Sequence, residues 1–116
     1  MIVDDEKDIA WLFARGLQKR GFEVELYNDP AIALSKFKPN HYAMLVLDVK
    51  MPGMSGFELL SKIKEKDPQQ KACFASGYEV HDEVQMDLLP DLDPDSIMKK
   101  PVTIAELEQR IRQELE

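Results

Sequence analysis

The chain has 116 residues, a length that one domain accounts for, and 44% of them are hydrophobic, which is enough for a modest core. Its formal net charge of −7 argues against direct nucleic-acid binding and against binding to anionic membranes, because both need a basic surface. The single cysteine excludes an internal disulfide. Without a signal-like segment or an apolar run of membrane-spanning length, we expect one cytoplasmic domain over residues 1–116.

The first part of the chain alternates strand and helix patterns. We predict strands over residues 1–3 and 22–27 and helices over residues 6–20 and 31–37. The first helix has apolar residues at helical spacing: Ile9, Leu12, Phe13 and Leu17. Asp29 and Pro30 start the second helix, because they provide an N-cap and a proline at the first helical position.

The second part of the chain continues the alternation. We predict strands over residues 44–47, 72–76 and 96–99, and helices over residues 56–66, 80–89 and 104–115. The run at 44–47 is short and continuously apolar, which is typical of a strand buried on both faces of a parallel sheet. Ser55 with Glu58, and Thr103 with Glu106, have the spacing of capping boxes at the starts of two helices.

Five strand–helix repeats predict an α/β fold. Alternation at this spacing is typical of a parallel sheet with helices on both faces. Since crossovers between parallel strands are right-handed, few topologies remain, and the doubly wound five-stranded order 2-1-3-4-5 fits best.

Polar residues follow four of the predicted strands. They are Asp4 and Asp5 after the first, Asp48 after the third, Ser76 after the fourth and Lys100 after the fifth. The carboxyl ends of parallel strands meet at one edge of a sheet, which is where open α/β sheets bind ligands. We therefore expect three carboxylates, a hydroxyl and an ammonium to converge there.

Three neighbouring carboxylates repel one another unless a cation joins them, and Mg²⁺ is the natural partner for such oxygen ligands. Asp48 is then a candidate nucleophile toward a phosphoryl group. Lys100 and Ser76 would bind phosphoryl oxygens, and Gly77 allows close approach of the loop. Taken singly, these residues also have plainer interpretations: a helix N-terminal acidic pair, a turn serine and a solvated lysine.

The motifs at these strand ends resemble a response-regulator receiver domain of two-component signalling over essentially the whole chain. The matching segments are residues 3–6 (VDDE), 47–56 (LDVKMPGMSG), 76–78 (SGY) and 100–101 (KP). The resemblance implies a flavodoxin-like sheet order and a signalling switch rather than an enzyme. It also implies that Asp48 accepts a phosphoryl group from the phosphohistidine of a histidine kinase or phosphotransfer protein.

The resemblance implies roles for the other residues as well. Mg²⁺ would be held by Asp5, Asp48 and the backbone carbonyl of Lys50, with Asp4 acting partly through water. Ser76 and Lys100 would be the switch hydroxyl and lysine, supported by Gly77 and by Pro101, whose peptide bond with Lys100 is often cis in the family. An output domain or effector protein would receive the signal, from a monomer or weak dimer.

Two departures from the family pattern affect the switch. Ile97 stands where the family usually has an aromatic residue, so we expect no aromatic rotamer change. Pro90 and Pro94 break helix continuation, so we expect residues 78–95 to be the least ordered segment and the one that phosphorylation changes most.

Two other functions compete with the phosphorylated switch. One is a docking module with the same fold that acts without phosphorylation, which is weaker because no acidic, lysine or acceptor position is lost. The other is an aspartate-nucleophile phosphohydrolase of the haloacid dehalogenase type. That class needs a second aspartate two residues after the nucleophile, where this chain has Lys50.

Overall fold

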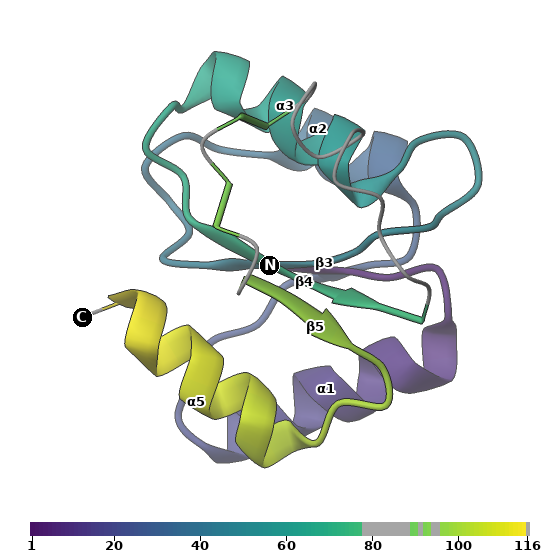
Figure 1. The fold of residues 1–116 in the computed structure, drawn as a ribbon, viewed down its shortest axis with the longest axis vertical. Helices are drawn as coiled ribbons and strands as arrows, with labels where there is room; N and C mark the ends of the chain where they lie inside the picture. Colours follow the sequence, from purple (N-terminus) through teal and green to yellow (C-terminus); the bar gives the residue numbers. More distant parts are fainter. Residues whose placement is uncertain (78–88, 91, 94–95, 116) are drawn as a thin grey trace.

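The computed structural model describes residues 1–77, 89–90, 92–93 and 96–115. Five strands and four helices lie in these ranges (Figure 1). The strands are β1 (Ile2–Val3), β2 (Leu26–Tyr27), β3 (Leu45–Asp48), β4 (Ala72–Ser76) and β5 (Ile97–Lys99). The helices are α1 (Lys7–Lys19), α2 (Pro30–Lys36), α3 (Gly56–Lys66) and α5 (Ile104–Leu115).

The strands form one parallel sheet in the order β2-β1-β3-β4-β5, which confirms the predicted topology. In register, Val3 lies beside Leu47, and Leu47 lies beside Phe74. This pairing places β1, β3, β4 and β5 side by side, so their carboxyl ends form one continuous edge.

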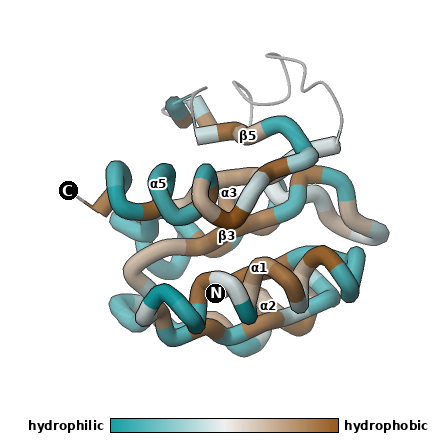
Figure 2. Tube along the Cα trace, turned by 90° about the horizontal axis from the view of Figure 1, so that it is seen from below, coloured by the Kyte–Doolittle hydropathy of each residue, from teal (hydrophilic) through white to brown (hydrophobic). Residues whose placement is uncertain are grey.

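Helices cover both faces of the sheet: α2 and α3 lie on one side, and α1 and α5 lie on the other (Figure 1). The strand side chains alternate between two hydrophobic clusters, because successive residues of a strand point to opposite faces. Val3, Leu47 and Phe74 belong to the cluster that includes residues of α2 and α3. Ile2, Val46 and Cys73 belong to the cluster that includes residues of α1 and α5. Figure 2 shows the resulting contrast between the brown, hydrophobic strand β3 and the teal, hydrophilic turns of α5.

Side-chain caps start three of the helices. The Asp29 carboxylate accepts hydrogen bonds from the amides of Ala31 and Ile32, at 2.8 and 3.3 Å. The predicted box at Thr103 is complete, because Thr103 Oγ1 accepts from the Glu106 amide and Glu106 Oε2 accepts from the Thr103 amide. At α3, the hydroxyl of Ser55 accepts from the amide of Glu58 at 3.1 Å, which is the first half of the predicted box.

Three predictions need correction or lie outside the described residues. Leu12, predicted to share one apolar face of the first helix with Phe13 and Leu17, is 60% exposed, because the buried face of α1 is formed by Ala10, Phe13, Ala14 and Leu17. The strand predicted over residues 22–27 pairs only at Leu26–Tyr27, since β1 has only two residues with which to pair. The helix predicted over residues 80–89 falls almost wholly outside the described residues, of which Leu89 alone is described and buried in the core.

Among the described helices, none has both the length and the apolar composition needed to cross a membrane.

The contact between α1 and α5 depends on a small residue, Gly16. A Cβ atom built on Gly16 of α1 would overlap Cγ1 of Ile104, the first residue of α5, and lie 2.6 Å from its Cδ1. The absence of a side chain at residue 16 therefore lets the start of α5 pack directly on α1.

Replacing Gly16 by alanine is expected to lower the free energy of unfolding by about 1–3 kcal/mol, because the added methyl group overpacks the contact with Ile104. This loss would appear even though alanine is the better helix former. Urea denaturation measures it. In the double variant Gly16→Ala/Ile104→Ala, the cost should be smaller than the sum of the two single costs; simple additivity would contradict the predicted contact.

Candidate functional site

The predicted polar residues lie at the carboxyl edge of the sheet. Asp48 is the last residue of β3 and Ser76 the last residue of β4, whereas Asp4 and Lys100 directly follow β1 and β5. Asp4, Asp48 and Ser76 are buried, with exposed fractions of 2%, 6% and 1%. Parallel pairing therefore brings together groups from four strands that are far apart in sequence, as the sequence predicts.

The Lys100 ammonium lies among three carboxylates. Its Nζ is 3.1 Å from Oδ2 of Asp4, 3.2 Å from Oε1 of Glu6 and 3.5 Å from Oδ1 of Asp48. The backbone also joins the strands here, because the Lys100 amide donates to the carbonyl of Ser76 at 2.7 Å. The Lys100–Pro101 peptide bond is cis, as the family resemblance implies.

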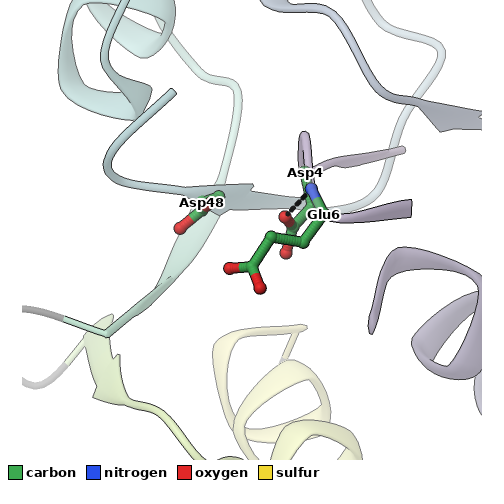
Figure 3. A group of neighbouring side chains, drawn as sticks. All are labelled: Asp4, Glu6 and Asp48. Carbon is green, nitrogen blue, oxygen red and sulfur yellow. Dashed lines mark hydrogen bonds between the residues drawn. The ribbon is translucent and has the colours of Figure 1, made fainter. Parts of the chain in front are cut away.

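Asp4 is fixed by both its side chain and its backbone. Its Oδ1 accepts a hydrogen bond from the Glu6 amide at 2.9 Å, which Figure 3 shows as a dashed line. The side-chain amide of Asn28, just after β2, donates to the Asp4 carbonyl at 2.9 Å. These contacts hold one Asp4 oxygen toward the start of α1 and leave the other facing Lys100.

The loop after Asp48 folds back tightly on it. The Gly56 amide donates to the carbonyl of Val49 at 2.8 Å, and a Cβ atom at residue 56 would overlap the Asp48 carbonyl oxygen. Gly53, directly after Pro52, has a φ of +84°, a conformation that favours glycine. The start of α3 is therefore packed against the backbone of the central aspartate.

Burial and like charges raise the pKa of Asp48. Desolvation is the largest cause, followed by the negative charge of Asp4, and the pKa rises from 3.8 to about 7. A hydrogen bond and the charge from Asp5 act in the same direction, whereas the ammonium of Lys100 opposes them. For Lys100, burial opposes the charged form, but the charges of Asp4 and Asp48 and hydrogen bonds to Asp4 and Glu6 raise its pKa overall.

The donor set fits a hard dication. Carboxylate oxygens of Asp4, Glu6 and Asp48 all lie within 4.8 Å of one another, and Asp5 is close enough to hydrogen-bond with Asp48. Because Glu6 is hydrogen-bonded to Lys100, Asp5 and Asp48 are the cavity-lining carboxylates that could hold a metal, and oxygen ligands of this kind suit Mg²⁺. A positive ion there would also relieve the repulsion that raises the pKa of Asp48. An open cavity of about 620 Å³ leads to these groups and is lined by Asp5, Glu6, Asp48, Lys50, Met51, Pro52 and Gly77.

The sequence did not identify Glu6 as part of this cluster. It directly follows Asp5 and is the N-cap residue of α1, so its sequence position indicated only a helix start. Its side chain extends from the start of α1 toward Asp48 (Figure 3). By contrast, Asp5, Lys50 and Gly77, which the sequence predicted at the site, do line the cavity.

Replacing Asp48 by asparagine is expected to stabilise the domain in metal-free buffer. The folded-state pKa of Asp48 lies above its ordinary value, so ionisation lowers stability as the pH rises from about 4 to about 7. The asparagine variant avoids this cost, and we expect a gain of about 1–3 kcal/mol at pH 8 and a smaller gain at pH 5.

Chemical denaturation at the two pH values measures this gain. Glu65→Gln, at an exposed position near the end of α3, is the matched control and should change stability little at either pH. A gain for Asp48→Asn that is equal at pH 5 and pH 8 would contradict the electrostatic origin.

Comparisons with known proteins agree on one family. A family model described as "Response regulator receiver domain" matches residues 1–112. The chain is 26% identical over 118 residues to "Response regulator receiver protein CpdR" of Brucella abortus, an alignment that covers 99% of this chain and 94% of that protein. It spans about half the length of several transcriptional regulatory proteins that it also matches.

Solved structures give the same result. A CheY-like response regulator receiver domain protein from Methanospirillum hungatei superposes with a TM-score of 0.86 at 29% identity, covering 98% of this chain and 90% of that one. The CheX–CheY–BeF3–Mg²⁺ complex of Borrelia burgdorferi contains a chain that superposes with a TM-score of 0.80 at 28% identity, covering 97% of this chain and 84% of that one. With the matching sheet order and the acidic edge described above, these results show that the chain belongs to the response regulator receiver domain family.

Proposed function

We propose that residues 1–116 act as one receiver domain that takes a phosphoryl group on Asp48 and passes the signal to an output domain or effector protein. The observation that carries this proposal is the position of the Lys100 ammonium, which lies among the carboxylates of Asp4, Glu6 and Asp48 at the carboxyl edge of the sheet. A buried carboxylate with a nearby cation is suited to accept a highly charged phosphoryl group.

The phosphoryl donor would be the phosphohistidine of a histidine kinase or phosphotransfer protein. An Asp48 carboxylate oxygen attacks phosphorus, a new oxygen–phosphorus bond forms, and the nitrogen–phosphorus bond of the phosphohistidine breaks. The bonding electrons leave with the imidazole, which takes up a proton. The reaction requires the ionised form of Asp48, so the factors that lower its raised pKa also promote the transfer.

Asp5, Asp48 and the Lys50 carbonyl would hold Mg²⁺, with Asp4 contributing partly through water. When bound, the ion neutralises negative charge on the phosphoryl oxygens and favours the ionised form of Asp48. The cavity lined by Asp5, Asp48 and Lys50 supports this assignment. So does the similarity to the Borrelia burgdorferi chain, which is part of a CheX–CheY–BeF3–Mg²⁺ complex.

Lys100 and Ser76 would bind two oxygens of the transferred group. The hydrogen bond from the Lys100 amide to the Ser76 carbonyl holds the ends of β4 and β5 together, so the two residues lie side by side at the edge of the sheet. Gly77 leaves the cavity open beside Ser76. Movement of Ser76 toward a phosphoryl oxygen would act first on the segment 78–95, which lies largely outside the described residues.

No observation favours either competing function over this one. Docking without phosphorylation would not require a buried aspartate beside a lysine. This chain also lacks the second aspartate that the phosphohydrolase class needs, because Lys50 stands at that position. The cytoplasmic location stays a prediction. The chain spans about half the length of several regulators that it matches, so the output domain or effector protein that it controls also stays a prediction.

The central test is phosphorylation with a small donor. We expect incubation with phosphoramidate and Mg²⁺ to add the mass of one phosphoryl group to the intact protein. Chelation of Mg²⁺ or the substitution Asp48→Asn should abolish the gain, because each removes a group required for transfer. Unchanged labelling of Asp48→Asn would rule out Asp48 as the acceptor, and absence of labelling in the unsubstituted protein would contradict the proposed function.

The metal assignment makes a second prediction. Asp5→Ala should weaken Mg²⁺ binding at least tenfold more than Glu6→Ala, because Asp5 follows β1 as a proposed ligand and Glu6 already pairs with Lys100. Isothermal calorimetry with MgCl₂ measures both affinities. Asp8→Ala, at an exposed position in the first turn of α1, serves as the control for loss of one charge. Equal losses at Asp5 and Glu6 would overturn the assignment.

A further inference from the structure

The side chain of Glu6 pairs with the lysine of the site and does not cap the helix that it precedes. Its Oε1 accepts a hydrogen bond from Lys100 Nζ at 3.2 Å, whereas its side chain makes no capping bond to α1, although Glu6 is the N-cap residue. The Glu6 side chain is 56% exposed, against 3% for Asp4 and 6% for Asp48. An exposed, unpacked side chain can release its partner at little structural cost.

The geometry around Lys100 favours Asp4 and Glu6 over Asp48. Lys100 Nζ makes hydrogen bonds with Asp4 and Glu6 at 3.1 and 3.2 Å, and its distance to Asp48 is 3.5 Å. Two of the three donors of the ammonium thus hold it toward Asp4 and Glu6, so a move toward a phosphoryl oxygen on Asp48 must stretch or break one of these two hydrogen bonds. Asp4 is buried and held by the Glu6 amide, which leaves the Glu6 side chain as the partner most easily exchanged.

We propose that Glu6 restrains Lys100 in the unphosphorylated domain and thereby slows the transfer of a phosphoryl group to Asp48. This inference rests on the proposed function and adds a residue that regulates the rate of phosphoryl transfer to Asp48. Glu6 is a positioning residue that acts through Lys100. Lys100 leaves Glu6 as it pairs with the incoming phosphoryl oxygen, so the strength of the Glu6–Lys100 pair adds to the barrier for transfer.

The Glu6–Lys100 pair should affect the rate of transfer but not the rate of hydrolysis. Once Asp48 is phosphorylated, Lys100 binds the phosphoryl group both before and during hydrolysis, and the Glu6 pair is already broken. Loss of Glu6 should therefore change the transfer rate and leave the hydrolysis rate unchanged. Because an ion pair with one exposed partner is weak, the expected acceleration of transfer is about two- to fivefold.

Two substitutions distinguish this restraint from a simple charge effect. Glu6→Ala removes both the charge and the contact. Glu6→Asp keeps the charge, but its side chain is one methylene shorter and its carboxylate falls short of Lys100. If the charge of residue 6 slows transfer by repelling the anionic donor, Glu6→Asp should be as slow as the unsubstituted protein. If the contact with Lys100 slows transfer, both Glu6→Ala and Glu6→Asp should be faster. Asp8→Ala removes a charge two residues further along without a contact to Lys100 and serves as the control.

The experiment measures the rate of phosphorylation by phosphoramidate at saturating Mg²⁺, and then the rate of hydrolysis after the donor is removed. We expect Glu6→Ala and Glu6→Asp to be phosphorylated about two- to fivefold faster than the unsubstituted protein, with hydrolysis unchanged and Asp8→Ala unaltered. Acceleration in Glu6→Ala alone, or in neither variant, would overturn the restraint while leaving the proposed function intact. Failure of the unsubstituted protein to become phosphorylated would overturn both.

Discussion

The placement of one ammonium among buried carboxylates is the constraint on which the site depends. Asp48 lies at the end of a strand that is buried along its whole length, and its own burial and the charge of Asp4 both oppose ionisation. The ammonium of Lys100, which follows β5, partly offsets this cost. The unmodified domain therefore holds negative charge that favours the approach of a cation, and this excess charge is built into the order of the strands.

The sheet order makes this constraint possible. Four strands contribute to the site, and only a parallel arrangement places all their carboxyl ends at one edge. The two hydrophobic clusters fix the register, since a shift of one residue would exchange the side chains that face α1 and α5 with those that face α2 and α3. Packing far from the edge thus determines which groups meet at Asp48.

Much of this could be predicted from the sequence because the signals are local and strong. The apolar run before Asp48, the proline and glycine after it, and the caps at Asp29 and Thr103 each specify their element without reference to distant contacts. The positions of the Glu6 and Leu12 side chains could not be predicted from the sequence. The outward position of Leu12 depends on which residues of α1 face the sheet, and the contact of Glu6 with Lys100 joins residues 94 positions apart. Neither is encoded in local spacing.

The close approach of Gly56 to the Asp48 carbonyl has a consequence for how this surface can vary among related proteins. The loop between β3 and α3 is closed by the Gly56–Val49 hydrogen bond, so its path is set by backbone contacts. The side chain of Lys50 is exposed, and the closing hydrogen bond joins backbone atoms alone. The loop can exchange this side chain while keeping its length and course. The chemistry at the aspartate and the surface that a partner recognises can therefore diverge independently over evolution.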